Sequence, residues 1–170
     1  WLFRNGKSAL EKTKNWYQAN RRTFIGIALI ALLYLLLQIP AIVMYRAVND
    51  SDSAHYGVAS YHIVDGKTRP MWFYGKHYNG AFSPHAAALF NLVFGKNPAH
   101  LRLVNSLQYL GFLLFLFAIV RRLSDDRIAL LAAALAAVPP YLINQFINNT
   151  YFASVMFFGS WGFYLLVRLL

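Results

Sequence analysis

A short polar stretch, Ser51-Asp-Ser-Ala-His-Tyr-Gly57, follows a long and mostly apolar run. Its Asp52 carries a carboxylate that can take a proton from a nucleophile, which is the task of a general base. The polar segment that follows also holds every histidine of the chain, namely His55, His62, His77, His85 and His100. Residues 47–100 are therefore the part of the chain where we expect chemistry.

The composition is that of a membrane protein. Of 170 residues, 58% are hydrophobic and only 13% are charged, which is far from the average soluble domain. The net charge of +10 does not indicate a nucleic-acid partner, because the basic residues flank apolar runs and can meet lipid headgroups there. The absence of cysteine excludes disulfides and thiolate metal sites. Membrane lipids are the expected partners.

Residues 1–22 are predicted to form a cytoplasmic, interfacial amphipathic helix. Aromatic and aliphatic side chains recur there at helical spacing, with basic residues between them. One face then suits the lipid interior and the other suits anionic headgroups. The alternative is a solvated helix that packs on another part of the protein.

Residues 23–46 are predicted to be the first transmembrane helix, because the run is uncharged until Arg46 and about twenty apolar residues cross the hydrocarbon. Pro40 is expected to kink this helix or to end its regular part. Residues 101–170 hold the further apolar runs Leu101–Val120, Ile128–Leu142 and Tyr151–Leu170. The sequence therefore predicts an all-α membrane protein with about four transmembrane helices. Since the last run is cut off by the chain end, we expect a fragment of a longer chain.

Residues 47–100 are predicted to be an extracytoplasmic loop with two short amphipathic helices. The first covers residues 52–64, with Asp52 as its N-cap, and the second begins at Ser83-Pro84 and ends near Gly95. The stretch between them is rich in aromatic and turn-forming residues and is expected to be extended. Both helices are too short to span a bilayer, so we expect them at its surface.

The loop contains an ordered series of short motifs: Asp52-Ser-Ala-His-Tyr-Gly-Val-Ala59, Ile63-Val-Asp-Gly66, Phe73-Tyr-Gly-Lys-His-Tyr-Asn-Gly80, Ala86-Ala-Ala-Leu-Phe90, Phe94-Gly95 and Leu101-Arg-Leu-Val-Asn105. Their order and spacing resemble the first extracytoplasmic loop of polytopic glycosyltransferases of the GT-C superfamily. That group includes protein mannosyltransferases and the aminoarabinose transferases of lipid A. The resemblance covers about residues 24–168 and rests on the series, since no single motif is specific.

The resemblance implies an enzyme that transfers a sugar from a polyprenyl-phosphate-linked donor to an acceptor at the outer face of the membrane. It implies that Asp52 is the catalytic base and that the loop helices lie parallel to the membrane. The expected substrate-binding residues are Lys76, Arg69, Arg102, Tyr74 and His55. The residue types agree with this chemistry, because inverting transfer needs a carboxylate for the acceptor proton and cations for the leaving phosphate.

The same residues also have simpler interpretations. Asp52 could act only as a helix cap, and Lys76 and Arg69 could bind lipid headgroups. The resemblance also implies acidic residues at or near three positions where this chain has none, namely Ser53, Ser83 and Ala153. The alternative function is therefore a non-catalytic subunit, a degenerate relative of the enzymes, with other membrane protein subunits as partners. A transporter is disfavoured because no ionisable residue lies within the predicted spans.

The histidines leave a divalent metal ion open as a cofactor, although none is certain. His77 and His85 together with Asp52 could form a mixed nitrogen and oxygen site, and some members of the resembling family use a divalent cation. No pair has the close helical spacing of a dedicated site, since His55 and His62 are seven residues apart. Interfacial hydrogen bonding is the alternative, and we assign no metal ligand.

We expect an integral protein of a bacterial inner membrane with a cytoplasmic amino terminus. Most Lys and Arg residues lie before residue 23, within 121–127 or near the end of the chain, and the positive-inside rule makes these segments cytoplasmic. The bacterial assignment comes from the absence of cysteine and from the resemblance.

Introduced cysteines test this topology, because the chain has none of its own. In intact cells, an impermeant thiol reagent is expected to label Ser83→Cys and to leave Ser8→Cys and Ser124→Cys unlabelled. Labelling of Ser124→Cys without labelling of Ser83→Cys would contradict the assigned orientation.

Overall fold

The computed structural model describes residues 2–44, 51–73, 76–140, 143–144, 147 and 151–169, except for the side chains of residues 2–17, 19, 41, 44, 52, 73 and 76–79. Its elements are α1 (Leu2–Met44), α2 (Ser51–Val64), β1 (Trp72–Phe73), β2 (Lys76–Gly80), α3 (Phe82–Phe94), α4 (Ala99–Leu123), α5 (Asp126–Ala137) and α7 (Phe152–Leu169). Apart from the short antiparallel pair of β1 and β2, the described chain is helical. The predicted all-α class is confirmed.

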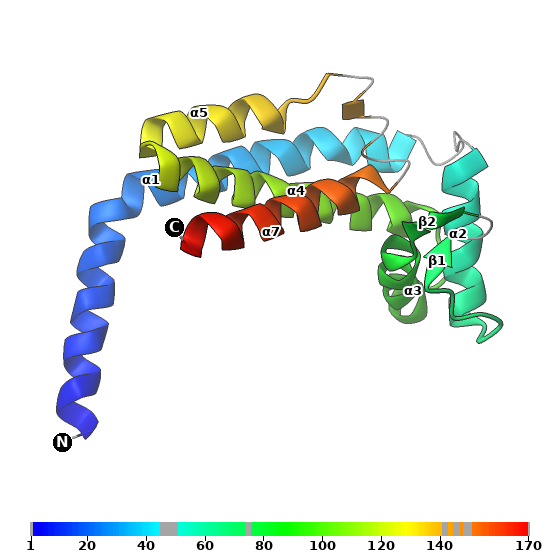
Figure 1. Ribbon diagram of the computed structural model, residues 1–170, viewed down its shortest axis with the longest axis horizontal. Helices are drawn as coiled ribbons and strands as arrows, with labels where there is room; N and C mark the ends of the chain where they lie inside the picture. Colours follow the sequence, from blue (N-terminus) through cyan, green and yellow to red (C-terminus); the bar gives the residue numbers. More distant parts are fainter. Residues whose placement is uncertain are drawn as a thin grey trace.

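Helices α1, α4, α5 and α7 form a bundle (Figure 1). Within the described chain, the segments long and apolar enough to cross a membrane are Asn20–Pro40, Ala99–Leu123 and Phe152–Leu169. Helix α5 has 12 residues, which is about 18 Å of helix against about 30 Å of hydrocarbon. The predicted span from Ile128 to Leu142 reaches beyond the described residues, so a fourth crossing stays a prediction.

Helix α1 joins two elements that the sequence separated. It is continuous from Leu2 to Met44 and contains Pro40, so the proline does not end the helix. In Figure 1 the dark-blue start of α1 runs at a steep angle to the bundle. The side chains of residues 2–17 lie outside those described, and their interfacial location stays a prediction.

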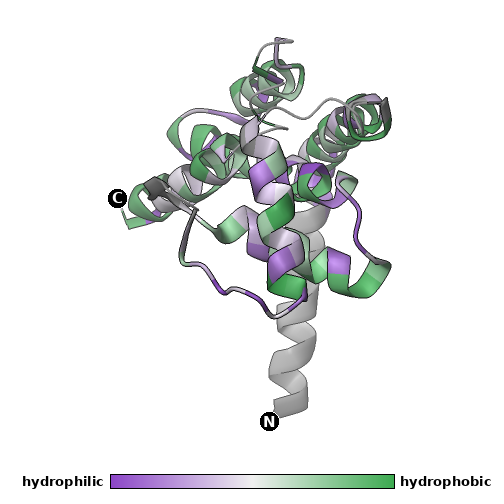
Figure 2. Ribbon diagram, turned by 90° about the vertical axis from the view of Figure 1, so that its right-hand side faces the viewer, coloured by the Kyte–Doolittle hydropathy of each residue, from purple (hydrophilic) through white to green (hydrophobic). Residues whose placement is uncertain are grey.

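At the opposite end of the bundle, α2, the β1–β2 pair and α3 form a cap. This succession of a helix, an extended stretch and a second helix agrees with the prediction for residues 47–100. Figure 1 shows the axes of α2 and α3 crossing the direction of the bundle, and Figure 2 views this cap with the bundle helices behind it. Such an orientation is the one expected for helices that lie along a membrane surface.

Helix α3 packs with its small and polar side chains inward. Its buried residues are Ser83, Pro84, Ala87, Ala88 and Asn91. Four of its large apolar residues point outward and are between 66% and 72% exposed, namely Leu89, Leu92, Val93 and Phe94. A helix on the surface of a soluble protein has the reverse pattern. The outward face of α3 suits the apolar part of a lipid leaflet.

The bundle helices approach one another at small residues. The buried residues of α5 are Ala129, Ala133 and Ala137. A Cβ atom at Gly26 of α1 would lie 3.0 Å from Cδ2 of Leu130, and one at Gly111 of α4 would collide with the ring of Phe157 on α7. Small residues permit such close backbone approach, which drives helix association in lipid.

Polar side chains inside the bundle are hydrogen-bonded between helices. The phenol of Tyr109 donates to the carbonyl oxygen of Ala136 at 2.8 Å. The amide of Gln38, which is 2% exposed, donates to Oδ1 of Asn144 at 3.1 Å. These bonds connect α1, α4 and the chain around α5 in a region where no water is expected to replace a lost partner.

Asp126 connects three helices at the end of the bundle away from the cap. Its carboxylate accepts hydrogen bonds from the hydroxyl of Thr23 on α1 and from Nε of Arg121 on α4, the latter at 2.7 Å. Arg121 also donates to Oδ1 of Asn20. The hydrogen bond from Thr23, and then the bond and charge of Arg121, hold the pKa of Asp126 below its usual value.

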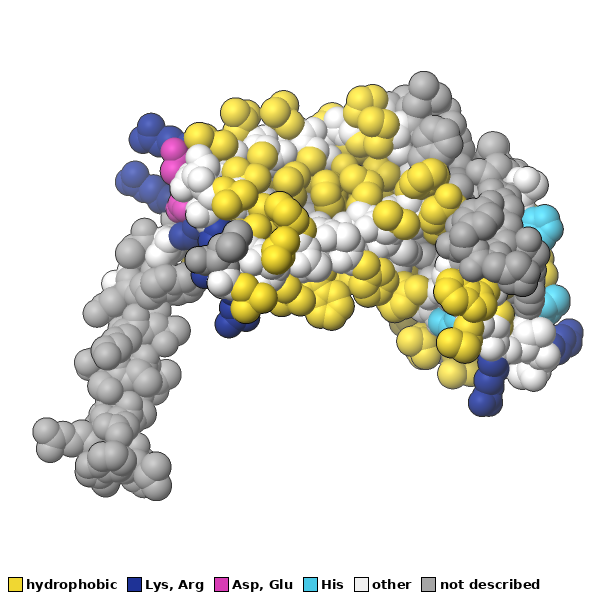
Figure 3. All heavy atoms as spheres, viewed as in Figure 1, with side chains coloured by type: hydrophobic (Ala, Val, Ile, Leu, Met, Phe, Trp, Pro, Cys, Tyr) yellow, Lys and Arg dark blue, Asp and Glu magenta, His cyan; other side chains and the backbone are white. Residues whose placement is uncertain are grey.

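Basic residues from distant parts of the sequence gather at this end, which supports its assignment to the cytoplasmic side. The group consists of Arg21, Arg22, Arg121, Arg122, Arg127 and Arg168. Figure 3 shows dark-blue side chains at both ends of the apolar band.

The structure improves the choice of positions for cysteine labelling. Ser83 is 3% exposed, so a cysteine there would react poorly. Met71 is 82% exposed and is the better outside position for the labelling experiment.

Asp126→Asn is expected to destabilise the bundle by about 1 kcal/mol, because solvent at this partly exposed site reduces the roughly 1.5–3 kcal/mol of a charge-assisted hydrogen bond. Because the pKa of Asp126 is lowered, its stabilisation exists above the unfolded-state pKa. That stabilisation is lost as the pH falls through the folded-state pKa. Thermal unfolding in detergent at neutral and acidic pH measures both effects, and the difference from the parent should shrink in acid.

Asp125→Asn is the matched control, with the same loss of charge one residue away. Asp125 caps α5 by accepting from the backbone N–H groups of Arg127 and Ile128 at 2.8 and 2.9 Å. Asparagine caps a helix as well as aspartate does, so this variant should unfold like the parent. Equal destabilisation by both substitutions would show that Asp126 has no special role.

Candidate functional site

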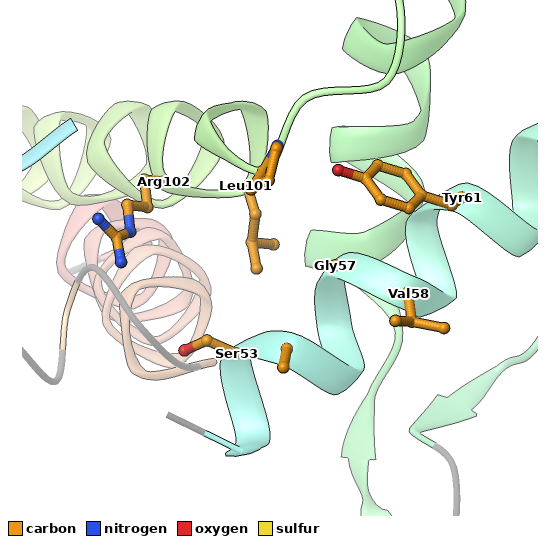
Figure 4. A pocket seen from close by; sticks show the side chains of 8 residues that line it. Ser53, Gly57, Val58, Tyr61, Leu101 and Arg102 are labelled. Carbon is orange, nitrogen blue, oxygen red and sulfur yellow. The ribbon is translucent and has the colours of Figure 1, made fainter. Parts of the chain in front are cut away.

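Helix α2 and the start of α4 enclose a pocket of about 200 Å³, which we call the α2–α4 pocket. It is lined by Ser53, Ala54, Gly57, Val58, Tyr61, Pro98, Leu101 and Arg102. In Figure 4 the Ser53 hydroxyl and the Arg102 guanidinium lie toward one end of the pocket, and the Tyr61 phenol lies toward the other. The fold thus brings together two stretches of the motif series that are far apart in the sequence.

Asp52 is the second residue of α2, because the helix begins at Ser51. It lies inside the first turn, so the prediction that Asp52 is the N-cap is wrong. Its side chain is outside those described, but the adjacent Ser53 is 4% exposed and lines the pocket. Unpaired backbone N–H groups and the positive end of the helix dipole favour an ionised carboxylate in a first turn. The backbone of Asp52 thus adjoins the pocket.

Arg102 is a predicted substrate-binding cation that the fold does bring to the pocket. It lies in the first turn of α4, and it is 4% exposed. A buried guanidinium is costly unless it is paired, and Arg102 does interact within the chain. Its planar set of donors is suited to phosphate oxygens. An anion at this end of the pocket would meet a cation that is held in position.

The other predicted substrate-binding residues are distributed differently. Arg69 and His55 are exposed, and neither lines the pocket. Nδ1 of His55 lies 2.6 Å from the carbonyl oxygen of Ser51, within α2. Lys76 begins β2, but its side chain is outside those described, and Tyr74 lies outside the described residues altogether. The roles of these four residues stay predictions.

Tyr61 lines the pocket, although the sequence did not single it out as a site residue. Burial raises the pKa of its phenol, and the ammonium of Lys96, 5.8 Å from the ring centroid, opposes that shift. The same ammonium lies 2.5 Å from Oδ1 of Asp65 and lowers the pKa of that carboxyl through a hydrogen bond. A protonated phenol can donate to an oxygen-rich ligand. Its helical spacing from Ala54 and Val58, which also line the pocket, is the signal in the sequence that could have found it.

Behind the pocket, Asn91 of α3 connects α2 with α4. Its amide donates to Oγ of Ser60 at 3.0 Å. Its Oδ1 accepts from the backbone N–H of Asn97 at 3.0 Å and lies 2.7 Å from Nδ1 of His100. The hydroxyl of Ser60 donates to the carbonyl oxygen of Gly57 at 2.6 Å. This junction was not predicted from the sequence, because its members come from three separate elements.

Ser83 and Ala153, two of the three residues noted in the sequence for the absence of an acid, do not line the pocket. Oγ of Ser83 is 2.8 Å from Oγ of Ser154, which donates to Oε1 of Gln108 at 2.9 Å. Ala153 is fully buried in the core of the bundle. Ser53 does line the pocket. Ser83 therefore connects α3 to α4 and α7, and it does not face a ligand in the α2–α4 pocket.

A metal ion gains no support from the described side chains. Among them, no three His, Asp or Glu residues converge. His85 is exposed, and its Nδ1 lies 2.8 Å from the carbonyl oxygen of Ala81. The side chains of His77 and Asp52 are outside those described, so the mixed site considered from the sequence is not tested by this geometry.

A family model described as dolichyl-phosphate-mannose-protein mannosyltransferase matches residues 81–170, which is more than half of the chain. The matched part includes α3, α4, α5 and α7, and with them Arg102 and Asn91. It begins after Asp52. No curated protein and no solved structure matches the chain.

The surroundings of Ser83 predict that a carboxylate is not tolerated at this position. Ser83→Glu would bury a carboxylate between α3 and α7, which costs several kcal/mol unless the charge is paired. We expect a strong loss of folded protein, measured by size-exclusion chromatography after detergent extraction. His85→Glu, on the exposed face of the same helix, is the control and should fold. A well-folded Ser83→Glu variant would contradict the assignment of Ser83 to helix packing.

Proposed function

Because the chain belongs to the dolichyl-phosphate-mannose-protein mannosyltransferase family, we propose that it is the amino-terminal portion of a membrane glycosyltransferase. The proposed donor is a sugar linked to a polyprenyl phosphate, and the proposed acceptor is bound at the outer face of the membrane. The family description itself names a lipid phosphate as the sugar carrier. The sugar and the acceptor of this protein are left open.

The observation that carries the proposal is that Arg102 and the first turn of α2 border the same pocket. Arg102 is buried and belongs to the matched region, whereas the first turn of α2 holds Asp52 and precedes that region. In the proposal, the Arg102 guanidinium on α4 and the carboxylate of Asp52 on α2 supply the two charges that sugar transfer from a phosphate donor requires.

In the proposed reaction, the carboxylate of Asp52 takes the proton from the acceptor's nucleophilic atom. That atom attacks the anomeric carbon of the sugar while the bond from this carbon to the phosphate oxygen breaks, and the electron pair of that bond remains on the leaving phosphate. Arg102, and by prediction Lys76 and Arg69, stabilise the charge that develops on the phosphate. The configuration at the anomeric carbon is inverted.

The proposal assigns the cap of α2, β1, β2 and α3 to the outer face of a bacterial inner membrane. The gathering of arginines at the other end of the bundle supports this orientation. The outward apolar face of α3 and the crosswise direction of α2 and α3 suit a location at the lipid surface. In this arrangement a membrane-bound donor reaches the α2–α4 pocket without leaving the bilayer.

A non-catalytic subunit of a larger membrane complex is the second candidate. It is favoured by the structural role of Ser83, which is hydrogen-bonded between helices, and by the burial of Ala153. Neither residue offers an acid, and Ser53 offers only a hydroxyl to the pocket. A chain that kept the fold of the family and lost its chemistry would show this pattern.

Asp52→Asn in the full-length protein separates the two candidates. The substitution keeps the size of the side chain and removes the proton acceptor, so transfer should fall by about 10²–10⁴. Loss of the favourable charge from the first turn costs only about 0.3–1 kcal/mol, so the protein should still fold and bind the donor. Transfer is measured with a radiolabelled polyprenyl-phosphate sugar in proteoliposomes.

Asp65→Asn is the matched control, because it removes one carboxylate at the other end of α2. Asp65 pairs with Lys96 and Lys67 and does not line the pocket, so transfer should stay near the parent level. Unchanged transfer by Asp52→Asn would exclude Asp52 as the base. A parent protein that transfers no sugar would favour the subunit.

A further inference from the structure

We infer that Asn91 is a positioning residue of the α2–α4 pocket, and that it sets the distance between the first turn of α2 and Arg102. This inference rests on the proposed function, because it concerns the geometry of the proposed reaction. Asn91 lies on α3, is 3% exposed, and is not one of the residues that line the pocket. It acts through the helices that it holds.

Each polar atom of the Asn91 side chain has a partner that defines its direction. The backbone N–H of Asn97 can only donate, so the atom it meets is Oδ1 of Asn91. Since Oδ1 can only accept, Nδ1 of His100 carries the proton in this contact. The amide nitrogen is left to donate to Ser60. The orientation of the amide is therefore determined by its surroundings.

One arm of this junction holds the α2 wall of the pocket. The hydroxyl of Ser60 accepts the Asn91 hydrogen bond and donates its own to the carbonyl oxygen of Gly57, one turn earlier on α2. Gly57 lines the pocket. Asp52 lies further toward the start of the same helix, so any rotation of α2 about its axis would move the proposed base.

The second arm holds the α4 wall. Asn97 directly precedes Pro98, and His100 directly precedes Leu101 and Arg102. Pro98, Leu101 and Arg102 all line the pocket. The ring of His100 also packs on Phe90 of α3, with the two ring centroids 6.1 Å apart. A single buried side chain thus connects α2, the helix that carries the proposed base, with the residues that precede the proposed phosphate ligand on α4.

Apolar packing accompanies the junction but cannot replace it. Tyr56, Ala87, Leu101 and Val104 form a buried cluster between α2, α3 and α4. Apolar contacts tolerate sliding and rotation, whereas hydrogen bonds of a buried amide are directional and costly to leave unmade. The junction therefore determines the register of α2 on α4, and the cluster supplies attraction.

The test uses Asn91→Leu and the milder Ser60→Ala in the full-length protein. If the junction positions the pocket, kcat should fall by about 10²-fold for a displacement of about 1 Å. The KM for the donor should change by less than about threefold, because the groups that bind it are still present. Thermal unfolding is measured on the same samples, so that loss of folded protein is not mistaken for loss of turnover.

Ser154→Ala is the matched control. It removes partly buried side-chain hydrogen bonds between α3, α4 and α7, but it breaks no bond to α2. It should leave kcat near the parent value even if it lowers stability. A similar loss of kcat in Ser154→Ala and in Ser60→Ala would reduce Asn91 to a general packing role and overturn the inference.

A distance measurement tests the geometry without any activity. Because the chain has no cysteine, spin labels can be attached at Val58→Cys on α2 and Leu114→Cys on α4, which are 47% and 45% exposed. Asn91→Leu and Ser60→Ala should shift or broaden the distance distribution between the labels, whereas Ser154→Ala should not. An unchanged distribution in both variants would refute the inference. If the parent transfers no sugar, the proposed function fails separately, and this measurement still decides whether Asn91 positions α2.

Discussion

In lipid, an apolar side chain gains little by turning from the bilayer toward another helix, so the bundle of this protein depends on close backbone approach and on hydrogen bonds. The surface agrees with this constraint, since Leu29, Leu135 and Leu165 are between 43% and 70% exposed. At the contacts between helices, the interior uses the buried alanines of α5 and the glycines of α1 and α4, beside larger buried side chains such as Tyr34 and Leu113. Where Gly111 meets Phe157, even one added methyl group would collide.

The polar contacts divide the molecule into two ends with different tasks. At one end, Asp126 ties α1, α4 and α5 together beside a group of arginines. At the other end, Asn91 and Ser83 tie the cap to α4 and α7. Hydrogen bonds are directional, so these ties determine how the helices are rotated, which apolar contacts alone would leave loose. The α2–α4 pocket exists because the cap is held in one rotation.

The pocket also explains why the enzymatic and structural interpretations are difficult to separate by residue type. Arg102 has the burial of a structural residue and the location of a ligand-binding one. Ser83 lies in the region that the family model matches, and its side chain is hydrogen-bonded between helices. The same fold could therefore serve a transferase or a relative that has lost its chemistry, and the decision depends on the group at Asp52.

The order of residues was enough to predict the membrane class, the long apolar spans and the two loop helices. Apolar runs and turn-forming residues are local signals, and the two loop helices begin one residue earlier than predicted. The helices of the bundle differ more, since α1 continues back to Leu2. The shift of one residue matters at Asp52, which the sequence made a cap and the fold made part of the first turn. The meeting of Ser53, Tyr61 and Arg102 and the junction at Asn91 were not predictable in this way. They join α2, α3 and α4, and long-range contacts between helices depend on how each helix is rotated and packed, which local spacing does not specify.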